Sequence, residues 1–78
     1  MNVKVLGTGC TKCKTLEQRL HDLKEQYNLN IDIEKVTEIT EIMAYGIMMT
    51  PGLIINEKVK SVGKVPTEDE LLKWIREV

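Results

Sequence analysis

The sequence has little of what usually holds a very small protein together. Its 78 residues include two cysteines, two prolines, one histidine and no phenylalanine. Two cysteines allow at most one internal disulfide, and a bridge between Cys10 and Cys13 closes a loop too short to constrain the unfolded chain much. We therefore expect these two cysteines to serve chemistry rather than to act as a structural disulfide.

Aromatic residues are also scarce, at 4% of the chain, although 42% of the residues are hydrophobic. The interior must then be built from isoleucine, leucine, valine and methionine. A chain of this length buries only about 60% of its unfolded surface, which leaves room for a single core. We expect residues 1–78 to form one globular domain.

Long runs of one kind of residue are missing as well. Eleven basic and twelve acidic side chains leave a net charge of −1, with no block of like charge. This pattern argues against nucleic acid or an anionic membrane surface as a partner. No apolar stretch reaches the roughly 18 residues that a membrane span needs, and no signal-peptide pattern opens the chain. We expect a cytoplasmic monomer.

Hydrophobic periodicity predicts an alternation of strands and helices. A helical stripe runs from the second cysteine to about Tyr27, and it consists of Cys13, Leu16, Leu20, Leu23 and Tyr27. An alternating pattern over 31–36 predicts a half-exposed edge strand, whereas the continuous apolar run 53–55 is typical of a central strand. The expected strands cover 2–6, 31–36, 53–55 and 59–62, and the expected helices cover 11–27, 38–45 and 68–78.

Turn and cap residues separate these elements. Thr37 is expected to cap the short second helix and Gly46 to end it. Asn56 and Glu57 provide a tight turn between the last two strands. Thr67 with Glu70 forms a capping box at the start of the closing helix. The predicted order is β-α-β-α-β-β-α.

The two cysteines lie where the first strand gives way to the first helix. At the helix N-terminus, unpaired backbone N–H groups and the helix dipole favour a thiolate, so the pKa of Cys10 should fall. The pKa of reactive cysteines in such motifs is roughly 3.5 to 7.5, whereas that of a free cysteine is about 8.5. Lys12 and Lys14 add positive charge nearby. Cys13 faces the core, which predicts that Cys10 attacks and Cys13 resolves.

Metal binding by the same two thiols remains an alternative. The spacing Cys-x-x-Cys after a strand also opens the loop of small copper chaperones, but these have a methionine where this chain has Thr8 and do not end in a helix. A closed zinc site needs about four ligands. His21, about 12 Å further along the helix axis, cannot complete a site with the pair and is expected at the surface.

Several features together resemble the thioredoxin superfamily, in particular its small prokaryotic thioredoxin-like and glutaredoxin-like redox-active disulfide proteins. They are Gly9-Cys10-Thr11-Lys12-Cys13 after a first strand, Thr50-Pro51 ahead of a β-hairpin, Gly63 after it, and a closing helix. The resemblance implies a thioredoxin-like α/β fold, with a four-stranded mixed sheet flanked by three helices.

The resemblance also implies a substrate-binding surface. It implies that Pro51 is cis and packs against the dithiol. It also implies that the backbone of Thr50 pairs with an extended partner segment and that Gly63 leaves room for that segment. Met48 and Met49 either line this surface or fill the core.

The chain departs from the family pattern in three places. Where thioredoxins have Trp before the first cysteine and Gly-Pro between the two, this chain has Gly9, Thr11 and Lys12. The first strand has no buried acid to assist Cys13, and Lys4, near that position, is expected to extend its charge into solvent. The residues after the hairpin do not match a glutathione site of the glutaredoxin type.

These features predict a thiol–disulfide oxidoreductase without cofactor or metal. Cys10 would attack a protein disulfide, Cys13 would resolve the mixed disulfide, and a donor similar to thioredoxin reductase would restore the dithiol. The alternatives are a carrier of a soft metal such as Cu(I) or Zn(II), and a scaffold or regulatory domain that keeps the fold without the activity.

Overall fold

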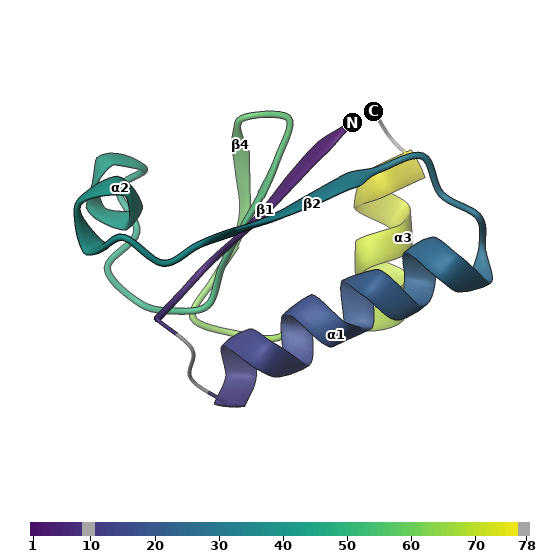
Figure 1. The fold of residues 1–78 in the computed structure, drawn as a ribbon, viewed down its shortest axis with the longest axis horizontal. Helices are drawn as coiled ribbons and strands as arrows, with labels where there is room; N and C mark the ends of the chain where they lie inside the picture. The colour runs from purple at the N-terminus through teal and green to yellow at the C-terminus, as the bar shows by residue number, and fades with distance from the viewer. Residues whose placement is uncertain (9–10, 77–78) are drawn as a thin grey trace.

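The structure, a computed structural model, describes residues 1–8 and 11–76. In this part of the chain a four-stranded sheet carries three helices (Figure 1). The strands are β1 (Asn2–Leu6), β2 (Asp32–Val36), β3 (Gly52–Ile55) and β4 (Lys58–Val62), and the helices are α1 (Thr11–Gln26), α2 (Ile39–Ala44) and α3 (Glu68–Arg76). The element order predicted from the sequence is confirmed.

The strands lie in the order β2-β1-β3-β4. β1 runs parallel to β2 and antiparallel to β3, and β3 runs antiparallel to β4. Parallel neighbours require a long crossover, which α1 provides between β1 and β2. The predicted places of β2 at an edge and of β3 inside the sheet are both confirmed.

Alternation along the strands divides the interior into two cores. Val3 and Val5 of β1 point to the face that α1 and α3 cover, whereas Leu6 points to the face of α2. Figure 1 shows α1 and α3 packed together and α2 apart from them. The larger core consists of Val3, Val5, Leu16, Leu20, Leu23, Ile31, Leu53, Ile55, Leu71 and Ile75, and the smaller core of Leu6, Val36, Ile42, Ile47 and Ile54.

Helix α1 buries the predicted stripe except at its end. Cys13, Leu16, Leu20 and Leu23 are buried. Tyr27 lies just after the helix and is 43% exposed, so its place on the buried stripe was wrong. The guanidinium carbon of Arg76 lies 5.6 Å from the centre of the Tyr27 ring, which joins the ends of α1 and α3 by a cation–π contact.

Helix α2 is attached to the sheet by few contacts. Its N-cap is Glu38, without a side-chain hydrogen bond, so the predicted cap at Thr37 was wrong. Gly46, with φ +77°, follows its end as expected. Ile42 is its one buried residue, whereas Ile39 and Met43 are 61% and 67% exposed. A helix of six residues turns only one side chain into the core.

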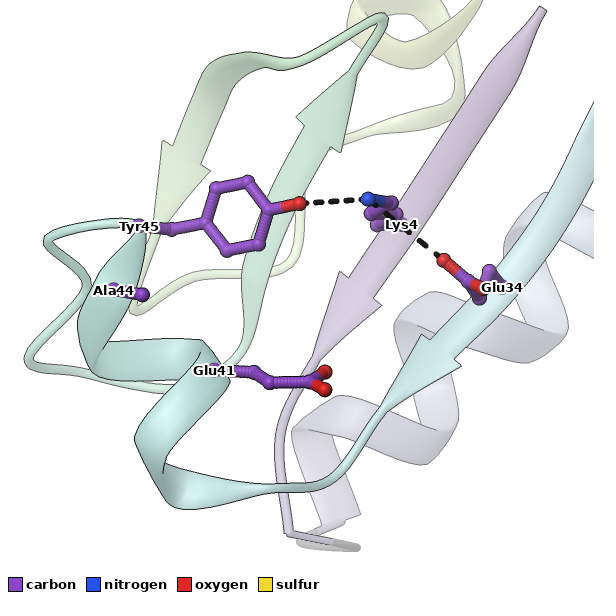
Figure 2. Close-up of a pocket in the computed structure, with 5 residues that line it drawn as sticks. All are labelled: Lys4, Glu34, Glu41, Ala44 and Tyr45. Carbon is purple, nitrogen blue, oxygen red and sulfur yellow. Dashed lines mark hydrogen bonds and ion pairs between the residues drawn. The ribbon is translucent and has the colours of Figure 1, made fainter.

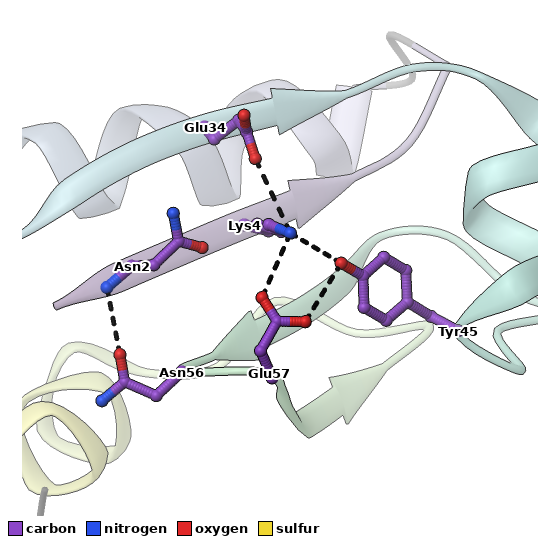
Figure 3. Close-up of polar contacts among 6 residues, drawn as sticks. All are labelled: Asn2, Lys4, Glu34, Tyr45, Asn56 and Glu57. Carbon is purple, nitrogen blue, oxygen red and sulfur yellow. Dashed lines mark hydrogen bonds and ion pairs between the residues drawn. The ribbon is translucent and has the colours of Figure 1, made fainter.

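The β3–β4 hairpin is fixed to β1 through its turn. Asn56 and Glu57 have φ of +49° and +67°, as a type I′ turn requires. The Asn56 N–H donates to the carbonyl of Asn2 over 2.8 Å, and the Asn2 N–H donates to Asn56 Oδ1 over 3.1 Å (Figure 3). The register of β4 slips opposite Leu53 and Ile54, which places a bulge in this edge strand.

Helix α3 begins with the predicted capping box. The Glu70 N–H donates to Thr67 Oγ1 over 3.2 Å, and Glu70 Oε1 accepts from the Thr67 N–H over 3.2 Å. That backbone hydrogen bond, with a smaller contribution from the charge of Lys64, holds the pKa of Glu70 below its ordinary value. The ionised carboxylate therefore favours the folded state.

We predict that Glu70→Gln lowers the free energy of unfolding at neutral pH. A carboxyl group with a lowered folded-state pKa adds stability above its unfolded pKa, about 4.3, and loses it as the pH falls through the folded value. The difference between wild type and variant should therefore shrink as the pH approaches 3. Urea denaturation at pH 7 and pH 3 measures it, and an equal difference at both pH values would contradict the role of the charge.

Candidate functional site

Cys13 lies in the first turn of α1, close to the end of β1. It is 2% exposed and begins the buried stripe that continues with Leu16 and Leu20. Its sulfur is disulfide-bonded in this structure, so the described state is an oxidised one. The other predicted cysteine, Cys10, lies outside the described residues. Cys13 thus has the buried position expected of a resolving cysteine.

Gly7 makes room for this cysteine. A Cβ atom at Gly7 would overlap Cys13 Sγ and would lie 3.1 Å from Cys13 Cβ and 3.7 Å from Thr50 Cβ. The Gly7 N–H also donates to the carbonyl of Val36 over 2.9 Å, which fixes this backbone against the end of β2. Because Gly7 has no side chain, the end of β1, the first turn of α1 and the loop before β3 meet at one point.

The loop before β3 contributes Thr50 and Pro51. The Thr50–Pro51 peptide bond is cis, as the resemblance implied, and Pro51 is buried. The carbonyl of Pro51 accepts a hydrogen bond of 2.8 Å from the N–H of Gly63, which follows β4. The structure therefore brings together four of the predicted site residues, namely Cys13, Thr50, Pro51 and Gly63.

Gly63 has φ +74°, a conformation that favours glycine. A Cβ atom here would lie 3.2 Å from Met49 Cβ and 3.3 Å from Met49 Cε. The sequence analysis expected this glycine to leave room for a partner segment. In this structure Met49 packs against that position.

A groove opens beside these residues, with a volume of about 310 Å³. It lies between α2 and the loop before β3, and the described side chains that line it are uncharged. The lining residues are Thr8, Ile39, Ile42, Met43, Ile47, Met48 and Thr50. Met48 is 96% exposed and Met49 64% exposed, so neither fills the core. We refer to this feature as the apolar groove.

The predicted modulating residues, Lys12 and Lys14, are exposed in the first turn of α1. No acidic side chain lies in that turn. The local charge at the start of the helix is therefore positive, in the same sense as the helix dipole.

The expectation that Lys4 extends its charge into solvent was wrong. Its side chain is only 18% exposed, and its charge is held inside a network rather than extended into solvent. Lys4 Nζ donates to Tyr45 Oη over 2.6 Å and to Glu57 Oε1 over 3.3 Å, and it lies 3.9 Å from Glu34 Oε2 (Figure 3). The hydrogen bonds to Tyr45 and Glu57 raise the pKa of Lys4 above its ordinary value.

The network borders a second hollow, of about 480 Å³, lined by Lys4, Glu34, Glu41, Ala44 and Tyr45 (Figure 2). Lys4 precedes Gly7 by three residues, about 10 Å along a strand. Its amine already has partners on β2, on the hairpin turn and after α2. We interpret this cluster as the attachment of α2 and the hairpin to β1.

Two residues of importance to this region were missed from the sequence. The sequence analysis did not single out Gly7, although its position directly between the first strand and the cysteines was a usable signal. Tyr45 gave no signal, because its partner Lys4 is 41 residues away in the chain. His21 is exposed, as expected.

Comparison with known proteins agrees with this geometry. The family model described as a thioredoxin domain matches residues 1–76. The thioredoxin of Methanothermobacter thermautotrophicus is 29% identical over 73 residues, which cover 94% of this chain and 95% of that protein. The thioredoxin of Methanocaldococcus jannaschii is 29% identical over 74 residues, which cover 95% of this chain and 85% of that protein.

The chain therefore belongs to the thioredoxin family. Its general role is that of a thiol–disulfide oxidoreductase. In the described part of the chain, no helix is long and apolar enough to cross a lipid bilayer.

We predict that Gly7→Ala shifts the equilibrium between the disulfide and dithiol forms toward the dithiol. The added Cβ overlaps Cys13 Sγ while the sulfur is bonded, whereas a free thiol can rotate away. Overpacking of this kind costs about 1–3 kcal/mol, so a shift of about tenfold is expected. Equilibration with mixtures of reduced and oxidised dithiothreitol measures it.

Gly46→Ala is the matched control. Gly46, unlike Gly7, has positive φ, but a Cβ there meets no atom within 4 Å. This variant should lose about 1 kcal/mol of stability and keep the wild-type redox equilibrium. If the disulfide–dithiol equilibrium is unchanged in Gly7→Ala, or shifts equally in Gly46→Ala, then Gly7 does not act through its contact with Cys13.

Proposed function

We propose that this protein reduces disulfides in other proteins, with Cys10 as the attacking and Cys13 as the resolving cysteine. The observation that supports this most is the burial of Cys13 against Gly7, whose other neighbour, Thr50, lines the apolar groove. A buried second cysteine is protected from competing reactions and reacts when the first has formed a mixed disulfide next to it.

The reaction consists of two exchanges. The Cys10 thiolate attacks one sulfur of the target disulfide, so that a Cys10–target bond forms and one target thiolate leaves. The Cys13 thiolate then attacks the Cys10 sulfur, which forms the internal disulfide and releases the second target thiolate. The target gains two electrons and this protein loses two. A dithiol donor similar to thioredoxin reductase returns them.

The chain provides the charge that the first exchange requires. The N-terminal end of α1 and the exposed amines of Lys12 and Lys14 favour the thiolate form of Cys10. The second exchange has no such help from the first strand, because the β1 side chain that carries a charge, Lys4, is held by Tyr45 and Glu57.

The partner in this scheme is an extended protein segment that carries the disulfide and an apolar side chain next to it. The backbone of Thr50 would pair with the segment, and the apolar groove would receive the apolar side chain. The uncharged lining of the groove and its position beside Thr50 support this occupant. Met49 would move aside or pack on the segment near Gly63.

We predict that the metal-free reduced protein reduces the disulfides of insulin and that Cys10→Ser abolishes the reaction. In Cys13→Ser the resolving step is blocked, so one mixed disulfide per chain should accumulate. Single-turnover mixing followed by acid quenching and mass measurement detects both results. Thermal unfolding of each variant controls for loss of the fold.

A soft-metal carrier would give a different result. A wild-type protein that reduces no disulfide but binds one Cu(I) or Zn(II) tightly per chain would contradict the proposal. Equal activity of Cys10→Ser and wild type would contradict the assignment of the attacking cysteine.

A further inference from the structure

Three of the four methionines are exposed in one region, beside the redox site. Met48 is 96% exposed, Met43 67% and Met49 64%. Met43 and Met48 line the apolar groove, and Met49 packs against Gly63. The fourth, Met1, is partly buried against the larger core. Exposed methionines and a protected one therefore exist in the same chain.

This placement has a chemical consequence. A thioether sulfur in contact with solvent reacts with hydrogen peroxide: one oxygen atom is transferred to the sulfur, and the peroxide leaves as water. The product, methionine sulfoxide, is polar, and the thioether has lost two electrons to the peroxide. A dithiol at the redox site does not protect these side chains, because the reaction requires only access to the sulfur.

Oxidation would change what the groove can bind. With Met43 and Met48 as sulfoxides, two of its seven lining side chains become polar and strongly hydrated, and the remaining apolar lining is Ile39, Ile42 and Ile47. An apolar partner side chain would then have to displace bound water from the sulfoxides. Cys13 is untouched, since it lies buried behind Gly7.

We propose that Met48, together with Met43 and Met49, is a site of oxidation by peroxide, and that this modification weakens the docking of protein disulfides while leaving the dithiol chemistry intact. The second half rests on the proposed function; the first does not. The protein would thereby lose protein targets under oxidising conditions before it loses its reactivity toward small disulfides.

The test starts from the oxidised protein, in which the cysteines are already in a disulfide and are not available to peroxide. The protein is treated with hydrogen peroxide, and peptide mapping by mass spectrometry follows each methionine over time. Met48 should be oxidised first, Met43 and Met49 next, and Met1 last. Oxidation of Met1 as fast as Met48 would overturn the assignment of the site.

The treated protein is then reduced with dithiothreitol, which opens the disulfide, and desalted. Single-turnover rates are measured with insulin and with bis(2-hydroxyethyl) disulfide. The insulin rate should fall by about tenfold, the effect of losing one well-buried methionine contact. The rate with the small disulfide should be unchanged. An unchanged insulin rate, or an equal fall for both substrates, would overturn the proposed effect on docking.

A variant with Met43→Leu, Met48→Leu and Met49→Leu is the matched control. Leucine keeps the groove apolar at similar volume but has no sulfur to oxidise. Its rate with insulin should be the same before and after peroxide. A fall as large as that of wild type would show that oxidation of other residues causes the loss, which would overturn the proposal. If the untreated wild type reduces neither substrate, the proposed function fails, and the peptide map alone decides whether the oxidation site is correct.

Discussion

The contact between Cys13 and the backbone of Gly7 is the constraint on which the site depends. Any side chain at Gly7 would occupy the position of the Cys13 sulfur, so the close approach of the first turn of α1 to the end of β1 requires a glycine. The same backbone is tied to Val36 of β2 and lies beside Thr50. The parallel β1-α1-β2 unit thereby brings the buried cysteine close to the loop that contains the cis Thr50–Pro51 peptide bond.

The two faces of the sheet are covered very unequally. Helices α1 and α3 add five buried apolar residues to the larger core, namely Leu16, Leu20, Leu23, Leu71 and Ile75, whereas α2 adds only Ile42 to the smaller core. The space that α2 leaves open becomes the apolar groove. Part of the attachment on this side is polar, through Lys4 and its bonds to Tyr45 and Glu57. A stable scaffold on one side and an open surface on the other suit the proposed docking of a target segment.

Much of the fold could be predicted from local patterns. Period-two alternation, helical stripes, the Asn56-Glu57 turn and the Thr67–Glu70 capping box each depend on residues close in sequence, and the structure has all of them. The predicted cap at Thr37 and the buried place of Tyr27 were wrong at helix ends. Other misses involve contacts between distant residues. Lys4 finds Tyr45 and Glu57 through tertiary packing, and Gly7 is required because of a sulfur atom on the next element. The buried side of α2 was overestimated because a stripe of Ile39, Ile42 and Met43 indicates which residues share a face, but not how much of that face the sheet covers.

The central claim is that the two cysteines are unequal, with Cys13 buried and Cys10 the one that reacts first. Alkylation of the fully reduced native protein by iodoacetamide tests this most directly, with peptide mapping to identify the modified residue. The account predicts rapid modification of Cys10 and modification of Cys13 only after urea has unfolded the chain. Equal rates for the two cysteines in the native protein, or faster modification of Cys13, would contradict it.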